Sequence, residues 1–226
     1  MSGGVWAVIP VKPLRGALRR LTSALEAPVR RDLQVAMLTD VLTACAGAGG
    51  LAGVMTVTSD PDAAAMAVAI AGARVVPDHD PPRGMNAAVA RGLAAVAAER
   101  ADAALVLTAD LPLATPEDLA AILAAGTPAP SALLVPSADG TGTNAMLLAP
   151  PAALAPLLGP DSYARHTVQA ARRGVPVTRL DLPRLALDID TPADLVALVA
   201  VGGNSVTHEV CARLRITDRL GAGSAL

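Results

Sequence analysis

The sequence predicts a single α/β domain with a mostly parallel sheet and helices on both faces of the sheet. Short apolar runs of strand length alternate with longer Ala- and Leu-rich runs of helical length, a pattern typical of parallel strands connected by helices. The 226 residues contain no internal repeat and no linker long enough to divide the chain, so one domain is favoured. We expect this domain over residues 1–201. A weakly periodic tail, residues 202–226, either docks on the domain or frays.

The predicted strands are short runs rich in Val, Leu and Ala. They lie at residues 5–11, 53–59, 74–77, 103–108, 131–136, 144–148 and 175–180, and an extended run follows at 185–189. The predicted helices lie at residues 29–46, 61–71, 86–100, 116–125, 161–173 and 192–201. Pro28 opens the first helix, Asp60 caps the second, and Thr115 and Thr191 each begin a capping motif followed by proline.

Composition argues against several classes of protein. The 18 basic and 20 acidic residues give a net charge of −2, so the chain lacks the basic field of a nucleic-acid-binding protein. Aromatic residues make up 1% of the chain, which removes the usual means of stacking on bases. No apolar run approaches the roughly 18 residues of a membrane span. Two cysteines suffice neither for a disulfide framework nor for a four-ligand zinc site, and we expect a cytoplasmic protein.

A basic loop follows the first predicted strand. Lys12 is the only lysine among the 18 basic residues, and Arg15, Arg19 and Arg20 come shortly after it. A strand, a basic loop and then a helix are well suited to hold a polyanionic phosphate. The loop has neither the P-loop pattern nor a G-x-G-x-x-G pattern. An exposed basic loop without a ligand is the alternative interpretation.

Three aspartates follow predicted strands. Asp110 comes two residues after the apolar strand 103–108, and Asp188 and Asp190 are two residues apart in an extended segment, so their side chains share a face. Because ligands bind at the carboxyl ends of parallel strands, these oxygens would suit Mg²⁺ and a nucleoside triphosphate. Asp190 has an alternative role as a polar turn residue ahead of the Thr191 cap.

Two glycine-containing segments are candidates for ligand binding. The turn 139–144 would let a ligand approach the backbone closely, although a plain hairpin turn explains the same residues. The loop 159–166 enters a helix whose N-terminus offers N–H donors to an anion. Without a serine or cysteine nucleophile beside them, His79 and His166 are better suited to structural or binding roles than to acid–base catalysis.

Taken together, these segments resemble the 2-phospholactate and phosphoenolpyruvate guanylyltransferases of coenzyme F(420) biosynthesis, which are related to the molybdenum-cofactor guanylyltransferases. The motifs that carry the resemblance run in family order from residue 5 to about residue 200. They are IPVK at 9–12, RL at 20–21, AML and DVL at 36–42, VTSD at 57–60, GMNAA at 84–88, ADLP at 109–112, DGTGTN at 139–144, GPDS and RH at 159–166, and DIDTP at 188–192.

The resemblance implies a Rossmann-like nucleotidyltransferase domain that transfers GMP from GTP to a small phosphorylated carboxylic acid with the help of Mg²⁺. The implied GTP-binding residues are Lys12, Arg15, Arg19, Arg20, Gly84 and Asn86. The implied metal ligands are Asp110, Asp188 and Asp190, and the implied acceptor-binding residues are Thr143, Gly159 and Ser162. Lys12 and Asp110 are the implied catalytic residues.

The chain departs from the family pattern in the first loop. The family usually has A-K-[ST]-R-L there, whereas this chain has ALRRL at 17–21. Leu18 replaces the second lysine, and Arg19 is the neighbouring residue expected to supply the charge. The acceptor (phosphoenolpyruvate, 2-phospholactate or 3-phosphoglycerate) and the oligomeric state, a homodimer included, stay open. The alternatives are a nucleotidyltransferase for another nucleotide and acceptor, and a non-catalytic nucleotide-binding module.

Overall fold

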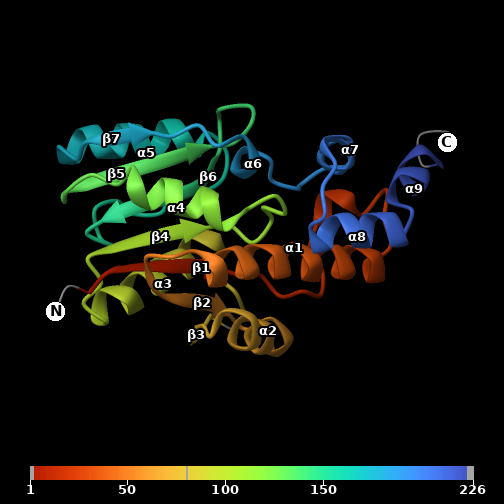
Figure 1. Ribbon diagram of the computed structural model, residues 1–226, viewed down its shortest axis with the longest axis horizontal. Coiled ribbons are helices and arrows are strands. Elements are labelled where there is room, and N and C mark those ends of the chain that lie inside the picture. The colour runs from red at the N-terminus through yellow and green to blue at the C-terminus, as the bar shows by residue number, and fades with distance from the viewer. Residues whose placement is uncertain (1–2, 80, 223–226) are drawn as a thin grey trace.

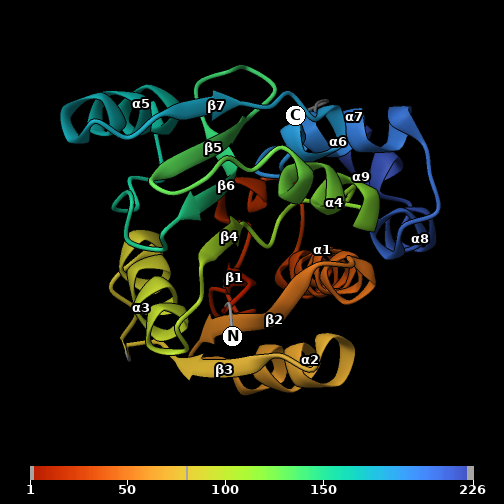
Figure 2. The ribbon, with the colours of Figure 1, turned by 60° about the vertical axis from the view of Figure 1, so that its left-hand side comes forward.

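The structure, a computed structural model, describes residues 3–79 and 81–222. Within these residues a seven-stranded sheet in the order β3-β2-β1-β4-β6-β5-β7 forms the centre of the molecule (Figures 1 and 2). The strands are β1 (Val5–Pro10), β2 (Leu51–Thr58), β3 (Arg74–Pro77), β4 (Ala103–Leu107), β5 (Ser131–Pro136), β6 (Thr143–Ala149) and β7 (Val177–Arg179). The predicted strands are therefore confirmed, although β7 is shorter than the run predicted at 175–180.

The sheet is mostly parallel, as predicted, with one reversed strand. Strand β1 pairs in parallel with β2 and β4, β2 with β3, and β5 with β7. Strand β6 is antiparallel to both of its neighbours, β4 and β5. The reversal follows from the short connection between β5 and β6, because parallel neighbours need a long crossover.

Helices flank the sheet at most of the predicted positions. They are α1 (Ala27–Gly47), α2 (Pro61–Ala71), α3 (Met85–Ala98), α4 (Pro116–Ala124), α5 (Ser162–Arg173), α6 (Pro183–Ala186), α7 (Pro192–Val201), α8 (Val206–Arg213) and α9 (Ile216–Ala222), with a short 3-10 helix η1 (Arg19–Leu21). The predicted caps are present: Asp60 accepts hydrogen bonds from the first turn of α2, and Thr115 and Thr191 form capping boxes at α4 and α7.

The extended run predicted at 185–189 is wrong in its first part. Leu185 and Ala186 belong to α6, and the following residues are irregular. The irregular segment still lies beside the end of β4, because the Ile189 N–H donates to the carbonyl oxygen of Asp110 at 3.1 Å.

Apolar side chains cover both faces of the sheet, as expected for buried parallel strands. Successive residues of β1 alternate between two apolar clusters: Ala7 and Ile9 belong to the cluster that includes residues of α1, α2 and α4, whereas Trp6 and Val8 belong to the cluster that includes residues of α3 and α5. Helices α1 and α3 lie on opposite faces of the sheet (Figure 2). The contact with α3 is close, because a Cβ on Gly92 would lie 2.4 Å from a methyl carbon of Val8. In this way a core without phenylalanine reaches close packing with small aliphatic side chains.

The segment after residue 201 docks on the domain as far as the structure describes it. Helix α8 lies along α1 (Figure 1), and both contribute to a third apolar cluster. Buried Asp40 of α1 accepts hydrogen bonds from the N–H groups of Val206 and Thr207 and from the Thr207 hydroxyl, at 2.8, 3.0 and 2.6 Å. Of the two alternatives for this segment, docking therefore describes α8 and α9, and residues 223–226 lie outside the described residues.

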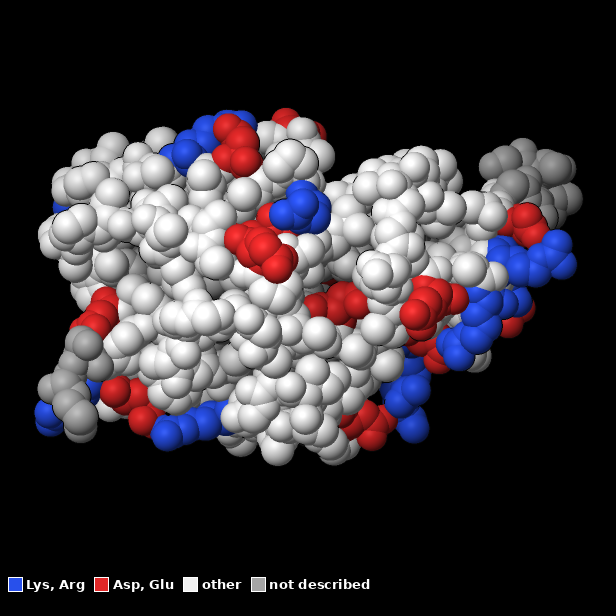
Figure 3. Space-filling model, viewed as in Figure 1, with Lys and Arg blue, Asp and Glu red and all other residues white. Residues whose placement is uncertain are grey.

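On the face shown in Figure 3, acidic and basic side chains lie interspersed around a largely uncharged surface. Among the described residues, no single helix is long and apolar enough to cross a membrane. Helices α7 and α8 reach the required length and apolar composition only as a pair, and they are bent by 109° relative to each other.

Candidate active site

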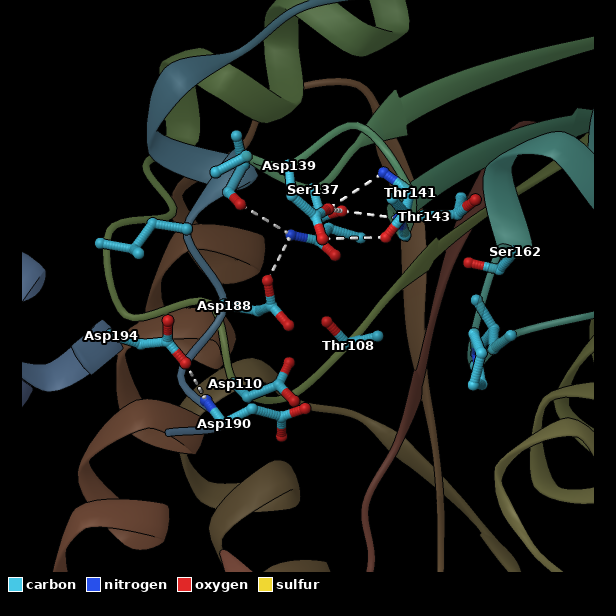
Figure 4. A pocket seen from close by; sticks show the side chains of 18 of the residues that line it. Thr108, Asp110, Ser137, Asp139, Thr141, Thr143, Ser162, Asp188, Asp190 and Asp194 are labelled. Atoms are coloured by element: carbon cyan, nitrogen blue, oxygen red, sulfur yellow. Dashed lines mark hydrogen bonds between the residues drawn. The ribbon is translucent and has the colours of Figure 1, made fainter. Parts of the chain in front are cut away.

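A pocket of about 600 Å³ lies where β1 and β4 end and β6 begins. Register brings the polar residues together there: Leu107 is opposite Ala145 in the β4–β6 pair, so Thr108 and Asn144 follow as neighbours. The remaining walls come from the β5–β6 turn, the loop before α5, and the segment between α6 and α7 (Figure 4). The pocket therefore occupies the carboxyl edge of the sheet, where the sequence predicts a ligand.

Most of the predicted site residues line this single pocket. They are Lys12, Arg20, Asp110, Thr143, Gly159, Ser162, Asp188 and Asp190. Four predicted residues do not line it: Arg15, Arg19, Gly84 and Asn86. Met85, between the last two, does line the pocket, so the start of α3 still borders it.

Asp110 has a buried carboxylate oxygen without a partner. Its Oδ1 atom makes no hydrogen bond within the described residues. Burial raises the pKa of Asp110 to about 6, and the negative charges of Asp188 and Asp190 also raise it. The Thr108 hydroxyl lies near enough to lower this pKa in part, but the two groups do not meet in hydrogen-bond geometry. An unpaired buried acceptor destabilises the structure, so the site favours a cation or a donor at this oxygen.

Asp188 is held in place by Asn144. The Asn144 amide nitrogen donates to the carbonyl oxygens of Leu185 and Ala186 and to Asp188 Oδ1, at 3.0, 3.1 and 3.1 Å. Burial raises the pKa of Asp188. Sequence reasoning did not single out Asn144 as a site residue, although its place at the end of a polar glycine-rich turn and the start of an apolar strand was a signal.

Asp190 forms an ion pair with Arg20 and does not form a metal-binding cluster with Asp110 and Asp188 among the described residues. The Arg20 guanidinium and Asp190 Oδ2 are 2.9 Å apart, and both side chains are exposed. Within residues 3–79 and 81–222, no group of three or more His, Cys, Asp or Glu side chains is close enough together to hold one metal ion. The three aspartates thus share a pocket (Figure 4) without forming a closed metal cluster.

The β5–β6 turn is both a hairpin turn and a wall of the pocket. Asp139 accepts hydrogen bonds from the Ser137 hydroxyl and from the backbone and hydroxyl of Thr141 (Figure 4). These bonds, with that from Ser137 the most important, lower the pKa of Asp139 to about 2. A Cβ on Gly142 would lie 2.7 Å from Ser137 Oγ, so a larger residue there would displace the Ser137 side chain that accepts from the Gly142 N–H.

Thr143 and Ser162 approach the pocket from different elements. Both are buried, Thr143 at the start of β6 and Ser162 at the start of α5 (Figure 4). The expectation that this helix N-terminus offers free N–H donors is only partly met. The Ser162 N–H donates to the carbonyl oxygen of Gly159 in the preceding loop, and the Tyr163 N–H donates to the carbonyl oxygen of Thr141 in the β5–β6 turn. The hydroxyls are the better candidates for binding an anion.

Asn86 holds the loop before α5. Its amide nitrogen donates to the carbonyl oxygen of Leu158 at 3.1 Å, and its amide oxygen accepts from the Leu158 N–H at 2.7 Å. Gly84, which caps α3, has a φ of +96°, a conformation that glycine adopts most readily. A nucleoside contact of these two residues stays a prediction, and the Asn86 amide is already engaged.

A hydrogen bond from Leu14 to Asp60 fixes the loop that carries Lys12. The Leu14 N–H donates to Asp60 Oδ2 at 2.8 Å, while Asp60 Oδ1 caps α2. Lys12 is exposed and lines the pocket. Leu18, with a φ of +52°, packs against the third apolar cluster. Leu18, which stands where the resemblance leads us to expect a second lysine, is thus part of the apolar packing.

The fold is shared with solved nucleotidyltransferase structures. A putative nucleotide-diphospho-sugar transferase from Desulfovibrio desulfuricans matches with a TM-score of 0.75 at 17% identity, covering 97% of each chain. A nucleotidyl transferase from Methanothermobacter matches with a TM-score of 0.64 at 19% identity, covering 86% of this chain and 95% of that one. This chain therefore has the α/β fold of these solved structures, with a polar pocket at the carboxyl edge of its sheet.

Sequence comparison gives the family. Residues 5–226 match the family described as "Guanylyl transferase CofC like". The phosphoenolpyruvate guanylyltransferase of Rubrobacter xylanophilus is 42% identical over 199 residues, which cover 88% of this chain and 95% of that protein. The phosphoenolpyruvate guanylyltransferase of Streptomyces coelicolor is 40% identical over 214 residues, covering 94% and 98%. The chain therefore belongs to the CofC-like guanylyltransferase family, and the match includes the segment 202–226.

Proposed function

We propose that this protein transfers GMP from GTP to phosphoenolpyruvate, releasing pyrophosphate, as a step of coenzyme F(420) biosynthesis. The names of the relatives favour phosphoenolpyruvate over 2-phospholactate or 3-phosphoglycerate as the acceptor. The observation that carries the proposal is the partnerless, buried Oδ1 of Asp110 in the same pocket as Lys12 and Arg20. Acidic and basic groups that meet at one sheet edge, with a buried carboxylate oxygen still unsatisfied, suit a metal–triphosphate ligand.

The basic side chains would neutralise the triphosphate. Lys12 and Arg20 both line the pocket, and Lys12 follows the end of β1 on a loop that Asp60 fixes. A lysine ammonium acts on phosphate as a compact point charge, and an arginine as a two-pronged donor. Arg20 would exchange its ion pair with Asp190 for a phosphate, which frees the Asp190 carboxylate.

The acidic side chains fit Mg²⁺. Asp110 and Asp188 would hold the ion, because Mg²⁺ is commonly bound through one or two carboxylates together with substrate phosphates and water. Asp190 would join them once Arg20 has turned to the triphosphate. A bound Mg²⁺ supplies positive charge that neutralises the phosphate oxygens. This use of the nucleotide as a ligand is consistent with the absence of a closed cluster among the described residues.

The reaction needs positioning more than acid–base chemistry. An oxygen of the acceptor's phosphate forms a bond to the α-phosphorus of GTP. The bond from that phosphorus to the oxygen bridging the α- and β-phosphates breaks, and pyrophosphate leaves with the oxygen and its electron pair. Because the nucleophile is already ionised, no general base is required. Lys12 stabilises charge on the leaving phosphates, while Thr143 and Ser162 hold the acceptor.

A pyrophosphate-release assay tests the proposal. We expect release from GTP with phosphoenolpyruvate, Mg²⁺-dependent and faster than with 2-phospholactate or 3-phosphoglycerate, and no comparable release from CTP or ATP. Faster release from CTP would identify a different nucleotidyltransferase. Binding of GTP in a titration calorimeter without release from any acceptor would identify a non-catalytic nucleotide-binding module.

A further inference from the structure

His166 lies in the second turn of α5, next to the proposed acceptor pocket, and its ring is completely buried. Both ring nitrogens have partners. The Leu157 backbone nitrogen is 2.9 Å from Nε2, and Thr143 Oγ1 is 3.1 Å from Nδ1. A backbone N–H only donates, so Nε2 must accept and carries no proton. In the neutral ring the proton is therefore on Nδ1, which donates to Thr143 Oγ1.

The surroundings keep the ring neutral. Burial and, to a smaller extent, the charge of Arg165 lower the pKa of His166 to about 4, while an interaction with the Ser162 backbone has the opposite effect. The first two influences disfavour the imidazolium form. The third influence is smaller and favours a protonated ring.

The direction of this hydrogen bond determines what Thr143 does. Its hydroxyl has one hydrogen, and the bond from His166 occupies the oxygen as an acceptor. Within the described residues Thr143 Oγ1 has no other hydrogen-bond partner, and Thr143 lines the pocket. The hydroxyl hydrogen is therefore free for a ligand, and a hydroxyl that is already accepting a bond donates more strongly.

We propose that His166 is a positioning residue, which orients the Thr143 hydroxyl as a hydrogen-bond donor toward an oxyanion of the acceptor. This inference rests on the proposed function for the identity of the acceptor as a phosphorylated carboxylic acid. The direction of the His166–Thr143 bond rests on the geometry alone. His166 does not touch the reacting atoms; it selects an anionic group over a hydrogen-bond donor at this position.

A double-mutant cycle tests the proposal. His166→Gln keeps an amide oxygen near the Nε2 position to accept from Leu157 and removes the donor to Thr143. We expect His166→Gln to raise the acceptor KM on the order of tenfold, with little change in kcat or in the GTP KM. In a Thr143→Val background, the same substitution should have little further effect. Equal effects of His166→Gln in both backgrounds would show that His166 acts only through the fold and would overturn the proposal.

Two further measurements keep the outcome interpretable. His208→Gln, on α8 and away from the pocket, is the matched control and should leave the acceptor KM unchanged. Nitrogen-15 NMR of histidine-labelled protein near pH 7, with the His166 signals assigned by their loss in His166→Gln, should show the neutral Nδ1–H tautomer. An Nε2–H or doubly protonated ring would contradict the proposal. Because this spectrum needs no turnover, it remains decisive if the wild-type protein fails to transfer GMP.

Discussion

At the scale of single residues, Asp110 combines opposite demands of stability and function. One of its carboxylate oxygens is buried and has no partner among the described residues, and this burial, together with two acidic neighbours, raises the pKa to about 6. In the absence of ligands, the charged form therefore destabilises the fold at neutral pH. Groups that destabilise a protein in this way are common in active sites, where a ligand supplies the missing interaction.

Asp110→Asn separates these two demands. The substitution keeps the shape and removes the charge, so we expect turnover to fall by at least about 100-fold, on the scale of a lost transition-state interaction. Without metal or nucleotide, the variant should melt no lower than the wild type at pH 7.5. A pKa raised in the folded state means that the wild type gains stability as the pH falls through about 6. Its deficit relative to the variant should therefore shrink toward pH 4.

Thermal melts between pH 4 and 8, together with turnover at several Mg²⁺ concentrations, check this expectation. Asp218→Asn, on the exposed surface of α9, is the control. Near-normal turnover of Asp110→Asn at low Mg²⁺ would exclude Asp110 as a metal ligand.

Ser162→Ala tests the acceptor side of the pocket. Each hydrogen bond to a charged group contributes about 1.5–3 kcal/mol, so the acceptor KM should rise roughly tenfold or more, while GTP binding without acceptor stays unchanged. Thr167→Ala, on the exposed side of the same helix, should change neither ligand. Equal weakening of both ligands by Ser162→Ala would mean that the loop before α5 is structural.

At the scale of elements, the conformation of the short helix η1 determines which of two neighbouring arginine side chains lines the pocket. Arg19 and Arg20 are neighbours and both are exposed, but only Arg20 of the two lines the pocket. The sequence alone favoured Arg19 as the substitute for the missing lysine, because it adjoins Leu18. Which way a side chain leaves a single helical turn depends on the left-handed backbone of Leu18, and nothing in the residue pattern predicts that conformation.

The two arginines form a matched pair for kinetics. Arg20→Ala should raise the GTP KM severalfold, with a smaller change in the acceptor KM, because it removes a charged contact with the triphosphate. Arg19→Ala should have a clearly smaller effect. A larger effect of Arg19→Ala would support the hypothesis that Arg19 supplies the charge of the lysine expected at position 18. In that case Leu18→Lys should restore GTP binding to the Arg19→Ala variant.

Helix α8 depends on one buried side chain of α1. Asp40 accepts three hydrogen bonds from the start of α8, and Asp40→Ala leaves these donors without a partner. We expect a loss of about 1–3 kcal/mol in the free energy of unfolding. Hydrogen exchange should quicken in residues 206–213 and not in α3. Unchanged exchange in α8 would show that apolar packing alone holds it.

At the scale of the whole molecule, local sequence patterns predicted the helices and strands well, but they did not predict contacts between residues far apart in the sequence. The capping motifs at Asp60, Thr115 and Thr191 determine helix starts through bonds within one turn, so they are readable from the sequence. The docking of α8 is not, because Asp40 and Thr207 are 167 residues apart. The apolar periodicity of this segment is weak, and tertiary contacts stabilise α8 and α9.

In the site too, some positions could be predicted from the sequence and others could not. Parallel strands bring their carboxyl ends to one edge, and this rule brings Lys12 and Asp110 into one pocket. Asp188 reaches the same pocket on an irregular segment that bonds to the end of β4, which the rule does not predict. The bonds of Asn144 and Asn86 depend on side-chain rotamers and on loops distant in sequence. Spacing along the chain contains no information about them.

The central claim concerns which bond of GTP is broken. Phosphorus NMR of a mixture of the protein, GTP, phosphoenolpyruvate and Mg²⁺ observes that bond directly. We expect the GTP signals to be replaced by equal amounts of pyrophosphate and a new diphosphate that joins GMP to the acceptor. Unchanged GTP, or the appearance of GDP with inorganic phosphate in place of pyrophosphate, would contradict guanylyl transfer at this pocket.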